Sequence, residues 1–218
     1  VAVGEYGVIL TSSDGSTWTN VREGSGNQSS LNGISFGNNT FVAVGESGSI
    51  LTSTNGTSWA DNTNHNVTSG GIYGVTYGNG IFVAVGYYGS TLTSSDGTSW
   101  ESRPQYLTQN NLRGVTYGNG IFVAVGDSGA RATSSDGTSW ELNQENVTQN
   151  TLRGVAYGNG TFVAVGNSGT TLTSADGDEW SLNQNYLTMG TTGEGNLKGV
   201  AFGNNTFVAV VDSANSEY

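Results

Sequence analysis

Three basic residues occupy the same place in successive copies of a repeated sequence. Arg113, Arg153 and Lys198 each stand between a leucine and a glycine, and Asn32 and Tyr73 hold this place in two other copies. A guanidinium group binds a carboxylate or sulfate through two parallel hydrogen bonds, so three cations at one level could hold an anion. Alternatively, the cations neutralise nearby acids in ordinary ion pairs. The candidate acids are Glu141, Glu145 and Glu194.

Tyrosines and side-chain amides form a second candidate group. Tyr87, Tyr88, Tyr106 and Tyr186 fall in segments that differ between the copies. Amides near these segments are Asn143, Gln144, Asn183, Gln184 and Asn185. Aromatic faces with planar amides suit a sugar ring, because they offer an apolar platform and paired hydrogen bonds. The alternative is that these tyrosines pack against their own repeat.

Little in the sequence points to catalysis. The chain has no cysteine and only one histidine, His65, so it offers no thiolate nucleophile and no histidine cluster for a metal or a catalytic triad. No pair of carboxylates stands apart in a setting that would separate the two pKa values. We therefore expect no catalytic residue, no metal and no cofactor.

Charge and hydropathy restrict the partners. Six basic and seventeen acidic residues give a net charge of −11, which repels a phosphate backbone, so we expect no nucleic-acid partner. No run of 18 apolar residues occurs, so we expect no membrane insertion.

The elements that must position these residues repeat along the chain. Tryptophans recur about 40 residues apart, a period typical of repeat architectures. These tryptophans are Trp18, Trp59, Trp100, Trp140 and Trp180. The copies run approximately over 1–30, 31–71, 72–111, 112–151, 152–196 and 197–218, and the first and last are partial. We expect one domain over 1–218. Because the sequence starts inside a copy at Val1, we also expect it to be part of something longer.

Each copy predicts four short antiparallel strands, which we call A to D in chain order. In the copy at 112–140, strand A is LRGVTY, strand B is FVAVG and strand D begins at the tryptophan. Gly-Asn-Gly and Asp-Gly supply the positive φ angles that tight turns need. Strand B lacks polar alternation, so both of its faces should be buried. Such a unit must stack between neighbours, as a propeller blade does.

The predicted fold is therefore an all-β propeller with five blades of four antiparallel strands. Strand A at 197–202 would complete strands C and D at 8–22, so that one shared blade closes the ring. Strand B is present once too often, at 1–3 and 207–210, which leaves a larger ring or array open. An open β-solenoid is a further alternative.

The turns between strands C and D carry a family resemblance. Their sequences are TSSDGSTW at 11–18, TSTNGTSW at 52–59, TSSDGTSW at 93–100 and 133–140, and TSADGDEW at 173–180. They resemble the Asp-box, or BNR, repeats of bacterial β-propellers, including sialidase-like and photosystem-assembly-factor-like proteins. They depart from these repeats in a turn one residue shorter and in Asn55, which replaces the aspartate.

The resemblance implies structural roles for the turn residues. In such a turn the carboxylate accepts backbone N–H groups and the tryptophan packs between blades. The residues concerned are Asp14, Asn55, Asp96, Asp136 and Asp176, with the five tryptophans. Sialidases also cluster three arginines over the channel, with a tyrosine nucleophile and acidic residues. At the start of strand A this chain offers two arginines and a lysine, so the resemblance implies a non-catalytic member.

Alternating strand direction places the B–C turns and D–A loops on one face of the repeats. The B–C turns differ between copies, whereas the A–B and C–D turns on the other face hardly change. Because loops on a constant frame carry function in repeat folds, we expect binding on the variable face. The candidate binding residues are Arg113, Arg153, Lys198, Tyr73, Tyr87, Tyr88, Tyr106 and Asp127.

These observations favour a non-enzymatic recognition module, extracellular or at the cell surface, that binds a glycan or a protein. The first alternative is a structural module of a larger cell-surface or filamentous assembly, formed by self-assembly or within a longer parent chain. The second is a degenerate, sialidase-like glycosidase. Asn66 and Asn146 lie in sequons of the D–A loops and are the candidate glycosylation sites.

Overall fold

The computed structural model describes residues 1–64, 68, 70–102, 106–183 and 195–212. In this part of the chain the strands form six sheets, and every strand pair is antiparallel. The predicted all-β class is therefore confirmed. The chain divides into two compact units, Val1–Gln109 and Asn110–Tyr218. The single-domain organisation over 1–218 stays a prediction.

The first unit contains one three-stranded and two four-stranded sheets. The three-stranded sheet consists of β1 (Ala2–Val3), β2 (Ile9–Thr11) and β3 (Thr19–Arg22). The next sheet consists of β4 (Leu31–Gly37), β5 (Thr40–Gly45), β6 (Ile50–Ser53) and β7 (Ala60–Asp61). The last consists of β8 (Ile72–Gly78), β9 (Ile81–Gly86), β10 (Thr91–Ser94) and β11 (Glu101–Ser102).

The second unit contains two four-stranded sheets and one two-stranded sheet. The first consists of β12 (Leu112–Gly118), β13 (Ile121–Gly126), β14 (Arg131–Ser134) and β15 (Glu141–Leu142). The second consists of β16 (Leu152–Gly158), β17 (Thr161–Gly166), β18 (Thr171–Ser174) and β19 (Ser181–Leu182). The two-stranded sheet consists of β20 (Leu197–Gly203) and β21 (Thr206–Val211).

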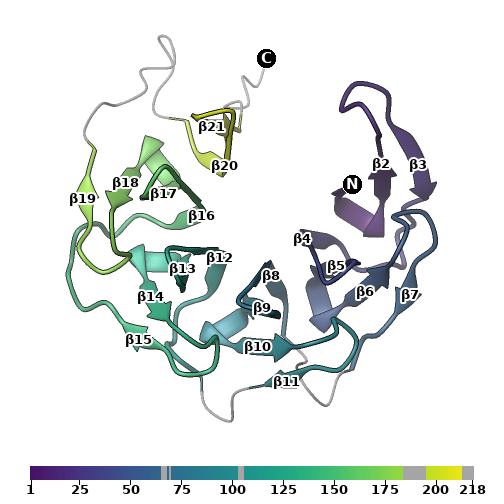
Figure 1. Cartoon of the computed structure of the whole chain (residues 1–218), viewed down its shortest axis with the longest axis horizontal. Coiled ribbons are helices and arrows are strands. Elements are labelled where there is room, and N and C mark those ends of the chain that lie inside the picture. The colour runs from purple at the N-terminus through teal and green to yellow at the C-terminus, as the bar shows by residue number, and fades with distance from the viewer. Residues whose placement is uncertain (65–67, 69, 103–105, 184–194, 213–218) are drawn as a thin grey trace. The chain divides into compact units, whose positions relative to one another are not determined.

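The four-stranded sheets follow the predicted order of strands A, B, C and D, each paired with the next (Figure 1). The sheet β1–β3 holds strands B to D, and the sheet β20–β21 holds strands A and B, as the partial copies predict. The repeat unit is therefore confirmed as a blade-like sheet. The number of five blades and the closure through a shared blade stay predictions.

Short 3-10 turns join strands B and C. They are η1 (Glu5–Gly7), η2 (Glu46–Gly48), η3 (Tyr87–Gly89), η4 (Asp127–Gly129) and η5 (Asn167–Gly169). The middle residue of each turn has a left-handed backbone, with φ between 52° and 55°. In the A–B turns the predicted positive φ angles are also present, for example 50° at Asn79 and 82° at Gly80.

Strand B forms the centre of each four-stranded sheet. Phe82, Val83, Ala84 and Val85 of β9 are completely buried, and the corresponding residues of β13 are too. The predicted burial of both faces is thus confirmed for the B strands of the four-stranded sheets. It is wrong for β21, where Val208 and Val210 are each 59% exposed. β21 lies in the last sheet of its unit, so no following sheet of that unit covers it.

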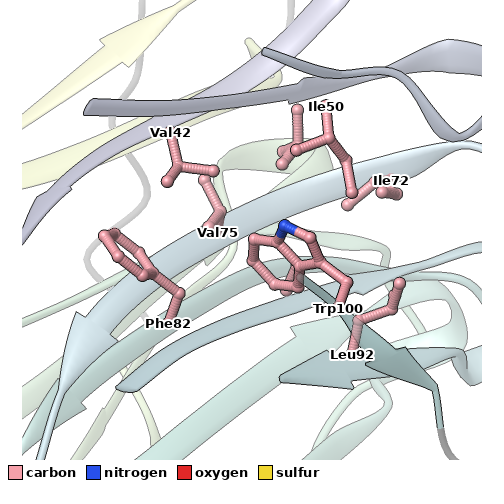
Figure 2. Packing of buried hydrophobic residues seen from close by; sticks show 9 residues of the cluster. Val42, Ile50, Ile72, Val75, Phe82, Leu92 and Trp100 are labelled. Atoms are coloured by element: carbon pink, nitrogen blue, oxygen red, sulfur yellow. The ribbon is translucent and has the colours of Figure 1, made fainter. Parts of the chain in front are cut away.

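Successive sheets pack through alternate residues of strand B, because neighbouring side chains on a strand point to opposite faces. In the first unit, Val42 and Val44 of β5 face the next sheet. Figure 2 shows Val42 and Ile50 above Phe82, Leu92 and Trp100 in this layer. Ala43 points the other way and joins a cluster with Ile9, Leu31 and Leu51. Strand β5 therefore contributes alternate side chains to the two sheets on either side of it in the first unit.

The C–D turns are closed by one side-chain oxygen. The Oδ1 atom of Asp96 accepts hydrogen bonds from the backbone N–H groups of Thr98 (2.7 Å) and Ser99 (2.8 Å). The indole N–H of Trp100 donates to the carbonyl oxygen of Gly97 at 2.9 Å. In the second copy the amide oxygen of Asn55 accepts the same two backbone bonds at 2.9 Å each.

These backbone donors hold the pKa of Asp96 well below its ordinary value. They act in the same way on Asp14, Asp136 and Asp176. A carboxyl whose pKa is lowered in the folded state stabilises the fold above its unfolded pKa, and this stabilisation is lost as the pH falls. The turns therefore make the folded chain sensitive to acid.

We expect the substitution Asp96→Asn to cost little at pH 7, because Asn55 already shows that an amide oxygen closes the turn. Asp96→Ala should lower the free energy of unfolding by about 1 kcal/mol. Between pH 6 and pH 3 the asparagine variant should lose less stability than the wild type, by a small amount because the carboxylate is exposed. Urea denaturation at both pH values measures this. The control Asn55→Asp should increase the acid sensitivity, and equal losses in all variants would contradict the prediction.

Candidate functional site

A β-bulge places the variable residue of strand A beside the B–C turn of its own sheet. In β12, Leu112 pairs with Gly126 and Gly114 pairs with Val125, so Arg113 between them is the extra residue of the bulge. The same shift occurs in β4, β8, β16 and β20. A bulge re-aims the side chain of the extra residue. It therefore explains why the strand A candidates are at one level in every copy.

Each bulge residue stands 14 positions before the residue that follows strand B, and in three sheets these two side chains contact each other. The Arg113 guanidinium binds both carboxylate oxygens of Asp127, through Nε to Oδ1 and through Nη2 to Oδ2 at 3.0 Å. The Nε of Arg153 donates to Oδ1 of Asn167 at 2.6 Å. The Lys198 ammonium lies 3.0 Å from Oδ2 of Asp212. We call the two residues at these positions in one sheet the rim pair, and the side-chain bonds within rim pairs are those of the sheets that contain β12, β16 and β20.

The rim pair of β12 changes the acidity of its carboxyl. Partial burial by itself raises the pKa of Asp127. The hydrogen bonds from Arg113 and from the side-chain amide of Asn111, at 2.9 Å, outweigh burial and hold the pKa below its ordinary value. The guanidinium is therefore neutralised by a stable anion in its own sheet.

The cations of strand A were predicted either to bind an anion or to form ion pairs with acidic residues. Arg113 and Lys198 form ion pairs, but with Asp127 and Asp212. Ion pairs of the cations with Glu141 or Glu145 stay a prediction, and Glu194 lies outside the described residues. Anion binding by Arg113, Arg153 and Lys198 stays a prediction, and such an anion would compete with the rim pairs.

A pocket of about 410 Å³ opens on the variable face of the first unit. Its lining comes from two B–C turns, two D–A loops and the bulge of β8. The lining residues are Glu46, Ser47, Thr68, Gly70, Gly71, Tyr73, Tyr87 and Tyr106. The prediction that B–C turns and D–A loops share one face is thus confirmed for this unit. We call this pocket the tyrosine groove.

Three of the candidate tyrosines form a cluster at the groove. The ring centroids of Tyr87 and Tyr88 are 4.5 Å apart, and those of Tyr88 and Tyr106 are 6.3 Å apart, with tilted planes. These distances are typical of favourable aromatic pairs. Tyr87, Tyr88 and Tyr106 are still 45%, 43% and 68% exposed, so their faces are open to a ligand.

The groove disfavours ionisation of the Tyr87 phenol. Partial desolvation raises the pKa of Tyr87 above its ordinary value, and the neighbouring phenol of Tyr88 adds to the effect. Tyr73 and Tyr106 contribute in the same direction. The Tyr87 ring therefore presents a hydroxyl group and an uncharged π face at neutral pH.

The backbone of Tyr88 is unusual for a tyrosine. Its φ of 52° lies in the left-handed region, which costs energy for a bulky residue. Serine occupies the same position in three other turns, at Ser47, Ser128 and Ser168. The turn itself does not require a tyrosine. The ring of Tyr88 instead forms an aromatic surface with those of Tyr87 and Tyr106.

One buried residue was missed by the sequence analysis. Arg131 of β14 is only 1% exposed. Its guanidinium donates to the carbonyl oxygens of Gly129 (3.1 Å) and Glu145 (2.6 Å) and to Oδ1 of Asn143 (3.2 Å). Burial lowers its pKa. Arg131 thereby ties the D–A loop to the B–C turn. The available signal was its place in strand C, where other copies have isoleucine or threonine.

The remaining candidates occupy separate places. Asn146 is exposed, and its side-chain oxygen accepts a hydrogen bond from Gln149. Asn66, His65 and Tyr186 lie outside the described residues. Across the ranges that the structure covers, no three acidic, histidine or cysteine side chains gather as a metal site would require. Nor does any helix within those ranges have the length and apolar character needed to cross a membrane.

Four-stranded antiparallel sheets that pack face to face in sequence order define a β-propeller repeat protein. No family model matches the sequence, and no curated protein matches it. Among solved structures, the chain is similar to "YCF48 bound to D1 peptide", with 24% identity and a TM-score of 0.62 over 83% of this chain and 62% of that one. The chain thus spans less than two thirds of that protein.

Two further propellers are similar in structure. YCF48 from Cyanidioschyzon merolae has 16% identity and a TM-score of 0.62, over 94% of this chain and 74% of that one. The RRP9 WD40 repeats have 11% identity and a TM-score of 0.66, over 93% and 66%. At these identities the similarity establishes the propeller fold. The more specific resemblance to Asp-box repeats stays a prediction.

Proposed function

We propose that this chain is a non-enzymatic recognition module that binds a polypeptide segment through the tyrosine groove. The observation that carries this proposal is the cluster of exposed rings around a pocket of about 410 Å³ on the variable face. Tyrosine supplies a large contact area at a low cost in conformational entropy and is enriched at binding hot spots. A structural neighbour, YCF48, is described as bound to a D1 peptide, which supports a peptide ligand by analogy of fold.

A glycan is the second candidate ligand, because exposed tyrosine faces also suit sugar rings. The supporting amides are less suitable than the sequence suggested. The amide of Asn143 donates to Asp178 and its oxygen accepts from Arg131, so it has little capacity left for a ligand. Asn143 belongs to the second unit and does not line the groove, so the preference for a polypeptide rests on the similarity to YCF48.

The finer features remain part of the proposal. We take the repeats to be of the Asp-box type, in a ring of five blades that a shared blade closes. We place the module outside the cell or at the cell surface. A glycan found on Asn146 in the native protein would support this location. A structural role in a larger assembly is the alternative, and it predicts self-association or fixed contacts with a partner.

The test is a binding screen of the labelled chain against a peptide array and a glycan array. The substitutions Tyr88→Ser and Tyr106→Ser should weaken the strongest peptide interaction about tenfold or more. Tyr6→Ser is the matched control, since Tyr6 has the same left-handed backbone, with φ of 53°. It should leave binding unchanged.

Each outcome of this screen separates the hypotheses. Binding to glycans alone, lost with the same two variants, would replace the peptide by a sugar. Binding that is indifferent to Tyr88 and Tyr106, or no binding to either array, would contradict the proposal. Concentration-dependent self-association in analytical ultracentrifugation would favour the structural alternative.

A further inference from the structure

We infer that the tyrosine groove receives the side chain of an arginine from the partner polypeptide, with its guanidinium against the tyrosine rings and its charge paired with Glu46. This inference rests on the proposed function and names the chemistry that the groove selects.

The first argument is the composition of the lining. Tyr73, Tyr87 and Tyr106 surround the pocket together with one carboxylate, and none of the lining residues that the structure describes is basic. The face of an aromatic ring carries negative electrostatic potential and attracts a cation within about 6 Å of its centroid. Arginine exploits such faces best, because its planar guanidinium stacks on a ring while its N–H groups bind a carboxylate.

The second argument is the rim pair of the sheet β4–β7. Glu46 holds the turn position that Asp127 and Asp212 hold in the second unit, where a cation at the bulge neutralises each carboxylate. In β4 the bulge residue is Asn32, whose side-chain amide donates to the carbonyl oxygen of Ile72 at 2.9 Å. The ion pairs found in the described ranges do not include Glu46. This sheet therefore presents the acid of a rim pair to the groove while its own strand supplies no cation.

The third argument is the charge of the whole chain. A net charge of −11 attracts a basic segment and raises its rate of association. A pocket of about 410 Å³ lies within the range of pockets that enclose small ligands. An arginine side chain together with a few waters fits such a volume, whereas a folded surface does not enter it.

The test is an NMR titration of the ¹⁵N-labelled chain with N-acetyl-arginine amide and with N-acetyl-citrulline amide, which has nearly the same shape but no charge. The amide signals of Ser47, Gly70 and Gly71 report on the groove. We expect saturable shifts with the arginine probe, a dissociation constant in the millimolar range, and binding of citrulline that is at least fivefold weaker. N-acetyl-lysine amide tests whether a point charge suffices, and lysine binding equal to that of arginine would overturn the choice of a guanidinium.

Variants identify the groups responsible. Glu46→Gln should weaken arginine binding at least fivefold and leave citrulline unaffected. Glu5→Gln is the matched control, because Glu5 starts the B–C turn η1 but does not line the groove. Tyr87→Phe should retain binding, since the ring remains, whereas Tyr87→Leu should abolish it. Equal binding of arginine and citrulline, no shift with either, or no effect of Glu46→Gln would each overturn the inference.

This inference and the proposed function can fail separately. A peptide that binds through Tyr88 and Tyr106 but tolerates the replacement of all its arginines by citrulline would preserve the recognition function and refute the arginine pocket. If no peptide in the screen depends on Tyr88 and Tyr106, the proposed function itself is wrong, whatever the small probes show.

Discussion

Replacing Gly166 by alanine should lower the free energy of unfolding by about 3 kcal/mol or more. A Cβ atom at Gly166 would lie 2.0 Å from the carbonyl oxygen of Thr151 and 2.9 Å from the Cα atom of Leu152. Both are backbone atoms of the neighbouring chain segment, so no side-chain rotation relieves the clash. The φ of −167° is extended and open to any residue, so the whole effect comes from the close approach of the two backbones.

The repeats provide a control for this prediction. Gly203, at the end of β20, has no atom within 4 Å of the place where its Cβ would lie. Gly203→Ala should therefore change the free energy of unfolding by no more than about 0.5 kcal/mol. Urea denaturation followed by tryptophan fluorescence measures both variants. If Gly166→Ala were as stable as Gly203→Ala, the close approach at the start of β16 would be wrong.

Trp100→Ala should cost about 3 to 5 kcal/mol, the typical loss for a buried tryptophan. The ring is only 8% exposed, packs with Val42 and Phe82 (Figure 2), and donates its N–H to Gly97. Its removal leaves a cavity between two sheets. Trp18→Ala is the matched control, because Trp18 makes the same hydrogen bond within its turn but is 45% exposed.

We expect Trp18→Ala to cost about 1 kcal/mol, since mainly the hydrogen bond and a partial ring contact are lost. The difference between the two variants measures packing between sheets separately from the closure of the turn. Chemical denaturation of both variants at one pH is sufficient. Similar losses for the two would mean that the tryptophans act chiefly within their turns.

The strands and turns of the repeat could be predicted from the sequence because every copy has the same pattern of apolar and turn residues. The apolar run in strand B, the Gly-Asn-Gly turns and the tryptophan period each depend on interactions within one or two repeats. The B–C turns were harder to predict. Tyr6 and Tyr88 adopt left-handed backbones. Glycine and asparagine favour this conformation, so two tyrosines gave no indication of it.

The candidate site was predictable only in part. Tyr73, Tyr87 and Tyr106 were recognised as variable, and they do line one pocket. The pairing of Arg113 with Asp127 was missed, because it depends on a bulge that only the strand register reveals. Arg131 was missed for another reason. Its place in strand C indicated burial, but nothing in the sequence showed that backbone carbonyl groups would accept hydrogen bonds from the buried guanidinium.

The rim pair has a consequence for how such a chain can diversify. Because the bulge residue and its turn partner are 14 positions apart in one copy, a recombination event that exchanges a whole repeat moves both together. Arg113 with Asp127, Arg153 with Asn167, and Lys198 with Asp212 can each be transferred together without separating two bonded side chains. Gene conversion can therefore change the exposed side chains of one sheet while those of the other sheets stay the same.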